Sequence, residues 1–417
     1  MEVMFEVACG LDVHKETVVA CIIEPNGARK TKKETRTFPS SGRGLEALAA
    51  WLEQKQVEGI AMEGTGIYWR PVYAALERRA RAWKLVVGNA HHVKNVPGRK
   101  TDVQDAEWLA SLVRVGLIRP SFVPPPAIRE LRDLTRYRKK LVEDRTREQS
   151  RVHKVLQTAN IKLDGVATDI FGVTGMLILE ALAEGTATPK EMAQLARGTL
   201  RKKMDALEVS LECRLSEVRR LMLGTALRLL TSFDRELASL DALIDRHAAP
   251  WQHLIERLKT IPGIDRVAAL TLLAELGPDV SVFPTAAHCA SWAGVCPGNN
   301  ESAGKSRDGA SQRGNVHIKT MLCQAAQSAA RTRDTYFSNK FHKLKSRRGH
   351  NKAVMALAHK ILISAYEMLR REEDFKELGG SYLDRRDRSR VARNLTERLR
   401  SLGFDVTVTE RPAALVG

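Results

Sequence analysis

The stretch from Val7 to Glu24, VACGLDVHKETVVACIIE, constrains the fold most, because it places a single carboxylate, Asp12, within an apolar strand. Two runs rich in β-forming residues flank the polar turn His14-Lys15-Glu16, and this pattern predicts a hairpin that opens a sheet. An ionised aspartate in a half-buried strand is costly unless a cation meets it. That cation can be a Lys or Arg side chain or a metal ion, and this stretch alone leaves both possibilities open.

Three further carboxylates follow at positions that suit a shared site. Glu63 ends a short apolar run just before Gly64-Thr65-Gly66, and a carboxylate at such a strand end faces the crevice where open α/β sheets bind ligands. Asp102 and Asp105 lie three residues apart in a predicted helix that starts near Thr101, so they share one helix face. Taken singly, such acids are more often helix caps or solvated surface groups, and a first-turn pair also suits the helix dipole.

The order of these acids, on a strand, at a strand end and then on a helix bearing D-x-x-D, is typical of nucleases of the RNase H and RuvC type. Four carboxylates can hold two divalent ions that clamp a scissile phosphate, and oxygen ligands suit Mg²⁺ or Mn²⁺. We therefore predict four catalytic metal ligands: Asp12, Glu63, Asp102 and Asp105.

The charge of the chain indicates its class of partner. Its 417 residues include 67 Lys and Arg against 49 Asp and Glu, a net charge of +18. Such an excess favours a polyanion, most simply nucleic acid. A membrane surface is the competing polyanion, but the longest clean apolar run near the N-terminus, Val18 to Ile23, is too short for a signal-peptide core or a spanning helix. We expect a cytoplasmic protein with no membrane partner.

Strand and helix signals alternate over residues 1–123, which predicts an α/β domain of RNase H-like order. Pro124-Pro125-Pro126 marks the first boundary. We expect a helical, coiled-coil-like arm over 124–255, a mainly helical domain over 256–371 and a basic tail over 372–417.

A long helix is predicted from Thr199 to Ile244, with apolar residues three and four apart. Its apolar stripe needs a partner, either the preceding helix or a second subunit. We favour an antiparallel arm that also dimerises.

The helical stretch from Ala127 to Asn160 carries ten Lys and Arg against five acids. A solvated surface helix is one explanation, but the bias favours a helix that follows a nucleic-acid backbone. Basic residues also cluster before the D-x-x-D helix and in a later glycine-rich loop. The candidate nucleic-acid contacts are Lys100, Arg136, Arg138, Lys139, Lys140, Lys305 and Arg307.

The loop from Ala293 to Ile318 is glycine-rich, polar and basic, and would be a long structureless insert if it had no task. Ser302 stands within N-N-E-S-A-G-K, where its hydroxyl is expected to be accessible. A flexible serine-containing loop is the alternative. Before it, the I-P-G-I turn suggests either half of a phosphate-binding helix-hairpin-helix or a structural helix-turn-helix, and Asp265 weakens the first possibility.

Together, the four acids, the I-P-G-I turn and the loop A-G-V-C-P-G-N-N-E-S-A-G-K resemble the DEDD transposases of the IS110 insertion-sequence family, which are bridge-RNA-guided recombinases. The resemblance extends to about residue 370. It implies a RuvC-like domain whose four acids match those predicted here, and a C-terminal transposase domain whose nucleophilic serine matches Ser302. It also implies a non-coding bridge RNA, donor and target DNA, and a homodimer or a homotetramer built as a dimer of dimers. Each active site would combine the acids of one subunit with the serine of another.

The implied chemistry is DNA cleavage and rejoining through a covalent phosphoserine, assisted by Mg²⁺ or Mn²⁺. Two alternatives stay open. One is a RuvC-type nuclease or junction resolvase in which water attacks and Ser302 is structural. The other is a non-catalytic RNA- or DNA-binding protein with vestigial acids.

Overall fold

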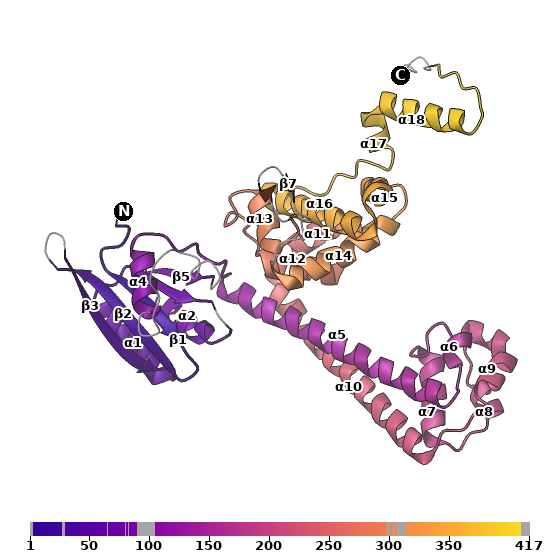
Figure 1. Cartoon of the computed structure of the whole chain (residues 1–417). Coiled ribbons are helices and arrows are strands. Elements are labelled where there is room, and N and C mark those ends of the chain that lie inside the picture. The colour runs from indigo at the N-terminus through magenta and orange to yellow at the C-terminus, as the bar shows by residue number, and fades with distance from the viewer. Residues whose placement is uncertain are drawn as a thin grey trace. The chain divides into compact units, whose positions relative to one another are not determined.

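The chain forms two compact units, Met1–Val123 and Pro124–Gly417, seen in a computed structural model (Figure 1). The structure describes residues 3–26, 30–64, 66–79, 81, 83–89, 105–297, 301–302, 305–306 and 314–409, with the backbone alone at 301–302 and 305–306. The domain boundary predicted from Pro124-Pro125-Pro126 lies at the same point in the chain, after Val123. The finer divisions at residues 255 and 371 stay predictions.

The first unit is built on a mixed five-stranded sheet of order β3-β2-β1-β4-β5. Its strands are β1 (Ala8–Val13), β2 (Thr17–Pro25), β3 (Thr31–Pro39), β4 (Gly59–Glu63) and β5 (Lys84–Gly88). The first three strands are antiparallel neighbours, whereas β1–β4 and β4–β5 are parallel pairs. The predicted hairpin is confirmed, with Asp12 opposite Val19.

Helices cover both faces of this sheet, because its central strands are buried on both sides. The helices are α1 (Gly42–Gln54), α2 (Trp69–Glu77) and α4 (Asp105–Arg114). Leu11 and Met62 pack in one cluster with α1 and α2. Ala8 and Ala61 point to the opposite face, where they pack against α4. The predicted α/β character of this unit is confirmed.

Two long helices form the arm of the second unit, α5 (Pro126–Thr158) and α10 (Glu217–Ala248) (Figure 1). Arg138 of α5 pairs with Asp241 of α10, and Arg145 pairs with Asp234. The residue numbers of the partners decrease along α10 as those along α5 increase. The two helices are therefore antiparallel, as predicted. Dimerisation through this arm stays a prediction.

Shorter helices pack in a separate core at the end of the arm. They are α6 (Leu163–Val166), α7 (Val173–Glu184), α8 (Pro189–Gln194), the 3₁₀ helix η2 (Gly198–Lys203) and α9 (Met204–Ser210).

The prediction of one helix from Thr199 to Ile244 is wrong. The chain leaves α9 after Ser210, and α10 begins only at Glu217. Leu211 keeps helical spacing but is buried in the core at the end of the arm. Ser216 then caps α10, since its side chain accepts a hydrogen bond from the Arg219 amide.

The rest of the second unit is mainly helical, as predicted. It contains the 3₁₀ helix η3 (Ala249–Trp251), α11 (Gln252–Lys259), α12 (Arg266–Leu276), α13 (Ala286–Ala293), β6 (Glu301–Ser302), β7 (Lys305–Ser306), α14 (Val316–Arg331), α15 (Tyr336–Arg348), α16 (His350–Arg371), α17 (Tyr382–Arg386) and α18 (Arg388–Ser401). Within the expected basic tail, α17 ends at Arg386 and α18 begins at Arg388. Among the described residues, no helix combines the length and the apolar character needed to cross a bilayer.

Candidate active site

The position of α4 on the sheet depends on Gly10. A Cβ atom at Gly10 would lie 2.0 Å from the backbone oxygen of Ala106 and 2.4 Å from the amide nitrogen of Ala110. Only glycine permits so close an approach. Earlier along β1, Ala8 packs in one cluster with Val113. Therefore α4 runs antiparallel to β1, and its N-terminus lies near the carboxyl end of that strand.

Asp12 and Glu63 lie at that same end of the sheet. Leu11 and Met62 are paired across the parallel strands β1 and β4, and the two acids are the next residues along. Because side chains alternate along a strand, Asp12 shares the face of Gly10, and Glu63 shares the face of Ala61. Both therefore point to the side of the sheet that α4 covers.

Asp105 is the first residue of α4, and its Oδ1 atom is buried. The structure thus brings Asp12, Glu63 and Asp105 to one end and one face of the sheet. Asp102 and Lys100 lie outside the described residues. Within the described part of the chain, no three His, Cys, Asp or Glu side chains are grouped closely enough to hold a metal ion.

His14, which was predicted only as a turn residue, is a neighbour of this site. Its Nε2 atom lies 3.0 Å from Oδ2 of Asp12, and its side chain is 59% exposed. Its position directly after β1, two residues from Asp12, was the available signal in the sequence.

The glycine-rich loop that was predicted to bear an accessible serine contains a short hairpin. Strands β6 and β7 are antiparallel, with Ser302 paired to Lys305 through their backbones. Arg307 lies outside the described residues. The two ends of the loop touch, because a Cβ atom at Gly314 would lie 2.3 Å from the amide nitrogen of Gly294. Gly294 and Gly314, which flank the serine segment in the sequence, are therefore in contact.

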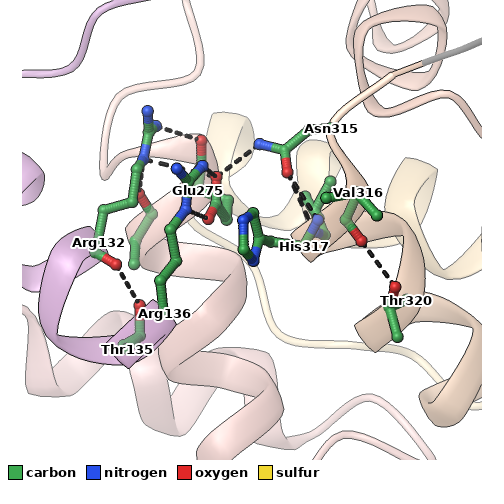
Figure 2. Close-up of polar contacts among 10 residues, drawn as sticks. Arg132, Thr135, Arg136, Glu275, Asn315, Val316, His317 and Thr320 are labelled. Atoms are coloured by element: carbon green, nitrogen blue, oxygen red, sulfur yellow. Dashed lines mark hydrogen bonds and ion pairs between the residues drawn. The ribbon is translucent and has the colours of Figure 1, made fainter. Parts of the chain in front are cut away.

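The C-terminal end of the serine loop is tied to a buried carboxylate (Figure 2). Glu275 of α12 is fully buried and accepts hydrogen bonds from Nε and Nη2 of Arg136, at 2.7 and 2.8 Å. It also accepts one from Nδ2 of Asn315, at 2.6 Å. Arg132 donates to the backbone oxygens of Ala274 and Glu275. Glu275 thus connects α5, α12 and the residue that caps α14.

Electrostatics keep the Glu275 carboxylate ionised. Burial by itself would raise its pKa, but the hydrogen bond from Arg136, the charges of Arg132 and Arg136 and the Asn315 amide together outweigh burial. The pKa of Glu275 therefore lies below the usual range of a glutamate.

Asn315 also organises the first turn of α14. Its Oδ1 atom accepts hydrogen bonds from the amides of His317 and Ile318, at 3.0 and 3.3 Å. Burial, helped by the nearby charge of Arg136, lowers the pKa of His317. Its Nδ1 atom is buried and has no hydrogen-bond partner among the described residues. Both features favour the neutral form of the imidazole beside the end of the serine loop.

Two of the arginines predicted to contact nucleic acid have carboxylate partners inside the unit. Arg136 binds Glu275, and Arg138 binds Asp241, a hydrogen bond that raises the pKa of Arg138. Lys140 is exposed and pairs only loosely with Glu143, 3.7 Å away. Contacts of Lys139 and Lys140 with nucleic acid, like those of Lys305, stay predictions.

The I-P-G-I turn makes structural contacts with α12 and α14. Asp265 is the N-cap of α12 and accepts a hydrogen bond from the Ala268 amide at 2.8 Å. Gly263 has a φ of +87°, and a Cβ atom there would lie 2.5 Å from the backbone oxygen of Ala325 in α14. These contacts favour the structural helix-turn-helix over a phosphate-binding turn.

Two family models match separate parts of the chain. A model for DEDD transposases of the IS110 type, described as a transposase, matches residues 9–161. A second, described as the IS116/IS110/IS902 transposase family, matches residues 255–343. The first range includes all four predicted acids, and the second includes Ser302.

Curated relatives match over shorter stretches. The chain is 31% identical over 125 residues to a transposase for insertion sequence element IS1111A from Coxiella burnetii, covering 29% of this chain and 34% of the relative. It is 33% identical over 141 residues to an uncharacterised 43.6 kDa protein of insertion element IS110 from Streptomyces coelicolor, covering 32% of each. The chain thus spans about a third of the length of these relatives. With both domain matches and the arrangement of the acids, the chain belongs to the IS110 family of insertion-sequence transposases.

Proposed function

We propose that the protein cleaves and rejoins DNA strands as the transposase of an insertion sequence, with a RuvC-like first unit. The observation that carries the proposal is the placement of Asp12, Glu63 and Asp105 at the same end and on the same face of a mixed sheet. Three carboxylates that are distant in the chain come to that position, where their like charges favour a cation. A site that acts on a phosphodiester uses divalent cations held by carboxylates in this way.

The donor set fits a hard divalent cation. Asp12, Glu63 and Asp105 offer only carboxylate oxygens, which suit Mg²⁺ or Mn²⁺, and Asp102 would add a fourth from the segment just before α4. When bound, such ions would neutralise the charge that develops on a phosphate under attack and favour ionisation of a hydroxyl nucleophile. His14, beside Asp12, would help to orient that carboxylate.

In this proposal Ser302 is the nucleophile. Its Oγ atom forms a bond to the phosphorus of a DNA phosphodiester, the proton of the hydroxyl is released to the surroundings, and the bond from phosphorus to one strand breaks. That strand leaves with a free hydroxyl once it takes up a proton. Attack by a hydroxyl of another strand then reverses the step and rejoins DNA, so no nucleotide cofactor is required.

The experiment that tests this compares Ser302→Ala with Ser306→Ala, a matched change in the paired strand of the same hairpin. Incubation with donor DNA and Mg²⁺ is followed by denaturing electrophoresis. We expect Ser302→Ala to abolish both strand cleavage and the protein–DNA adduct, and Ser306→Ala to retain both. Cleavage that persists in Ser302→Ala would favour a RuvC-type nuclease that uses water.

We also propose that a bridge RNA guides the reaction, in line with the family resemblance and the net charge of +18. RNA that co-purifies with the expressed protein, when its locus is included, would be sequenced. We expect one discrete RNA encoded beside the gene. A heterogeneous mixture of cellular RNA would contradict guidance and leave the DNA chemistry untouched.

A further inference from the structure

A cavity of about 540 Å³ opens where α14 ends, α15 passes and α16 begins. Arg331 is the last residue of α14, and Arg333 lies in the connection to α15. Helix α15 contributes His342 and Lys345, and α16 contributes its first residue, His350. Side chains from four consecutive segments therefore converge on one opening, which none of the predicted site residues lines.

The lining of this cavity is basic. None of its nine residues is Asp or Glu, while two are Arg, one is Lys and two are His. Arg331, Arg333 and Lys345 are exposed, and in the described part of the chain none of the three has a carboxylate within ion-pair distance. On the arm, by contrast, Arg136 and Arg138 are neutralised by internal acids. The cavity thus concentrates positive charge that no described carboxylate compensates, and such charge attracts an anion.

Packing beneath the cavity gives it a fixed shape. Phe341 is only 4% exposed, and its ring meets the rings of His342 and His350 edge-on, with centroids 5.4 and 5.6 Å apart. Ser338 Oγ donates a hydrogen bond to the backbone oxygen of Ala330 at 3.0 Å, which ties α15 to the last turn of α14. The charged groups are therefore held around an aromatic floor.

The start of α16 adds backbone donors. Its N-cap is Gly349, with a φ of +80°, and no side chain caps the first turn. The first amides of a helix lack intrahelical acceptors, and the N-terminus of a 22-residue helix carries partial positive charge. This end of α16 therefore reinforces the charge of the side chains.

We propose that this cavity binds the phosphodiester backbone of a nucleic-acid strand. Its volume is that of a site for a small ligand or a single strand segment, and guanidinium and ammonium groups are the usual phosphate ligands. The inference deepens the proposed function, because it adds a phosphate contact remote in sequence from the acids and from Ser302. Either DNA or RNA can supply the phosphodiester.

The test measures binding of the full chain to a labelled DNA duplex, a DNA single strand and an RNA single strand, in EDTA so that no strand is cut. Fluorescence anisotropy is recorded over a series of salt concentrations for the wild type and for the double variant Arg331→Ala/Lys345→Ala. Each lost phosphate contact should reduce the slope of log affinity against log salt by about 0.7 to 0.9. A smaller slope with all three probes supports the site, and a reduction confined to DNA or to RNA supports it and identifies the source.

The matched control is Arg370→Ala/Arg371→Ala, which removes two exposed positive charges from the other end of α16. An equal change in slope for both double variants would overturn the proposal, since it would reflect net charge alone. No change in either would overturn it as well. Circular dichroism confirms that each variant is folded. The assay requires no cleavage, so its outcome is independent of whether Ser302 proves to be the nucleophile.

Discussion

Glu275 lies in an apolar helix, RVAALTLLAEL, and is fully buried. A carboxylate in that position is stable only because Arg132 and Arg136 supply positive charge and Asn315 a further donor. Replacing such a group with an apolar one of equal volume can be neutral, but removing one partner alone leaves buried charge without compensation. Glu275 therefore holds three segments together, but relative to an apolar residue of the same volume it adds little to the free energy of unfolding.

Glu275→Gln should lower the free energy of unfolding of the second unit by about 3 to 5 kcal/mol, because two arginines lose their counter-charge. Urea denaturation followed by circular dichroism measures this. The control is Glu367→Gln, whose exposed pair with Arg371 on α16 should contribute under about 0.5 kcal/mol. Equal effects of the two changes would show that Glu275 is not the critical carboxylate.

The lowered pKa of Glu275 makes stability depend on pH. A carboxyl group whose pKa is lower in the folded state stabilises the fold above its unfolded pKa, near 4.3, and loses that contribution as pH falls through the folded value. The difference in melting temperature between wild type and Glu275→Gln should therefore be constant near neutral pH and shrink below about pH 4. A difference that is unchanged down to pH 3 would contradict this assignment.

At the scale of elements, one glycine sets the distance between α4 and the sheet. Gly10 has the backbone of Ala106 against it, and Asp105 is the next residue towards the start of the helix. Any side chain at position 10 must push α4 away and carry Asp105 with it.

Gly10→Ala should cost about 1 to 3 kcal/mol, as overpacking does, and should also abolish metal-dependent cleavage because Asp105 is displaced. Thermal unfolding and the cleavage assay are measured together. Gly42→Ala is the matched control, since a Cβ atom there meets nothing within 4 Å. If Gly10→Ala cleaved DNA at the wild-type rate, the role of α4 in positioning the acid would be refuted.

Apolar runs bounded by a polar turn predicted the opening hairpin, because its strands β1 and β2 are nearly continuous buried segments joined by His14-Lys15-Glu16. The helical spacing of apolar residues wrongly predicted one helix over residues 199–244, because Leu211 keeps that spacing although the chain turns there. Asp12 was recognised as an acid in an apolar strand, and the same argument applied to Glu275 would have identified it. Its partner Arg136, 139 residues away, could not be identified from local pattern, because the contact depends on how α5 meets α12.

At the scale of the whole molecule, the acids and the serine belong to different compact units. Asp12, Glu63 and Asp105 lie in the first, and Ser302 in the second. If the acids and Ser302 form one active site, as we propose, the two units must meet, either within one chain or between chains. The family resemblance implies the second arrangement.

Mixing two inactive variants distinguishes these arrangements. If each site takes acids from one subunit and the serine from another, a mixed dimer of Asp12→Ala and Ser302→Ala contains one intact site. Cleavage should then reappear when the variants are co-expressed, while each alone is inactive. Size-exclusion chromatography with light scattering establishes that mixed oligomers form. Inactivity of confirmed mixed oligomers would place both groups of a site in the same chain.

The contact between Gly294 and Gly314 fixes the distance between the two ends of the serine segment, whatever the length of the segment. Because these two glycines touch, the spacing between the end of α13 and the start of α14 does not depend on the residues between them. The free energy of closing such a loop rises only slowly with its length. The segment that contains Ser302 can thus change in length at little cost while the surrounding helices keep their packing.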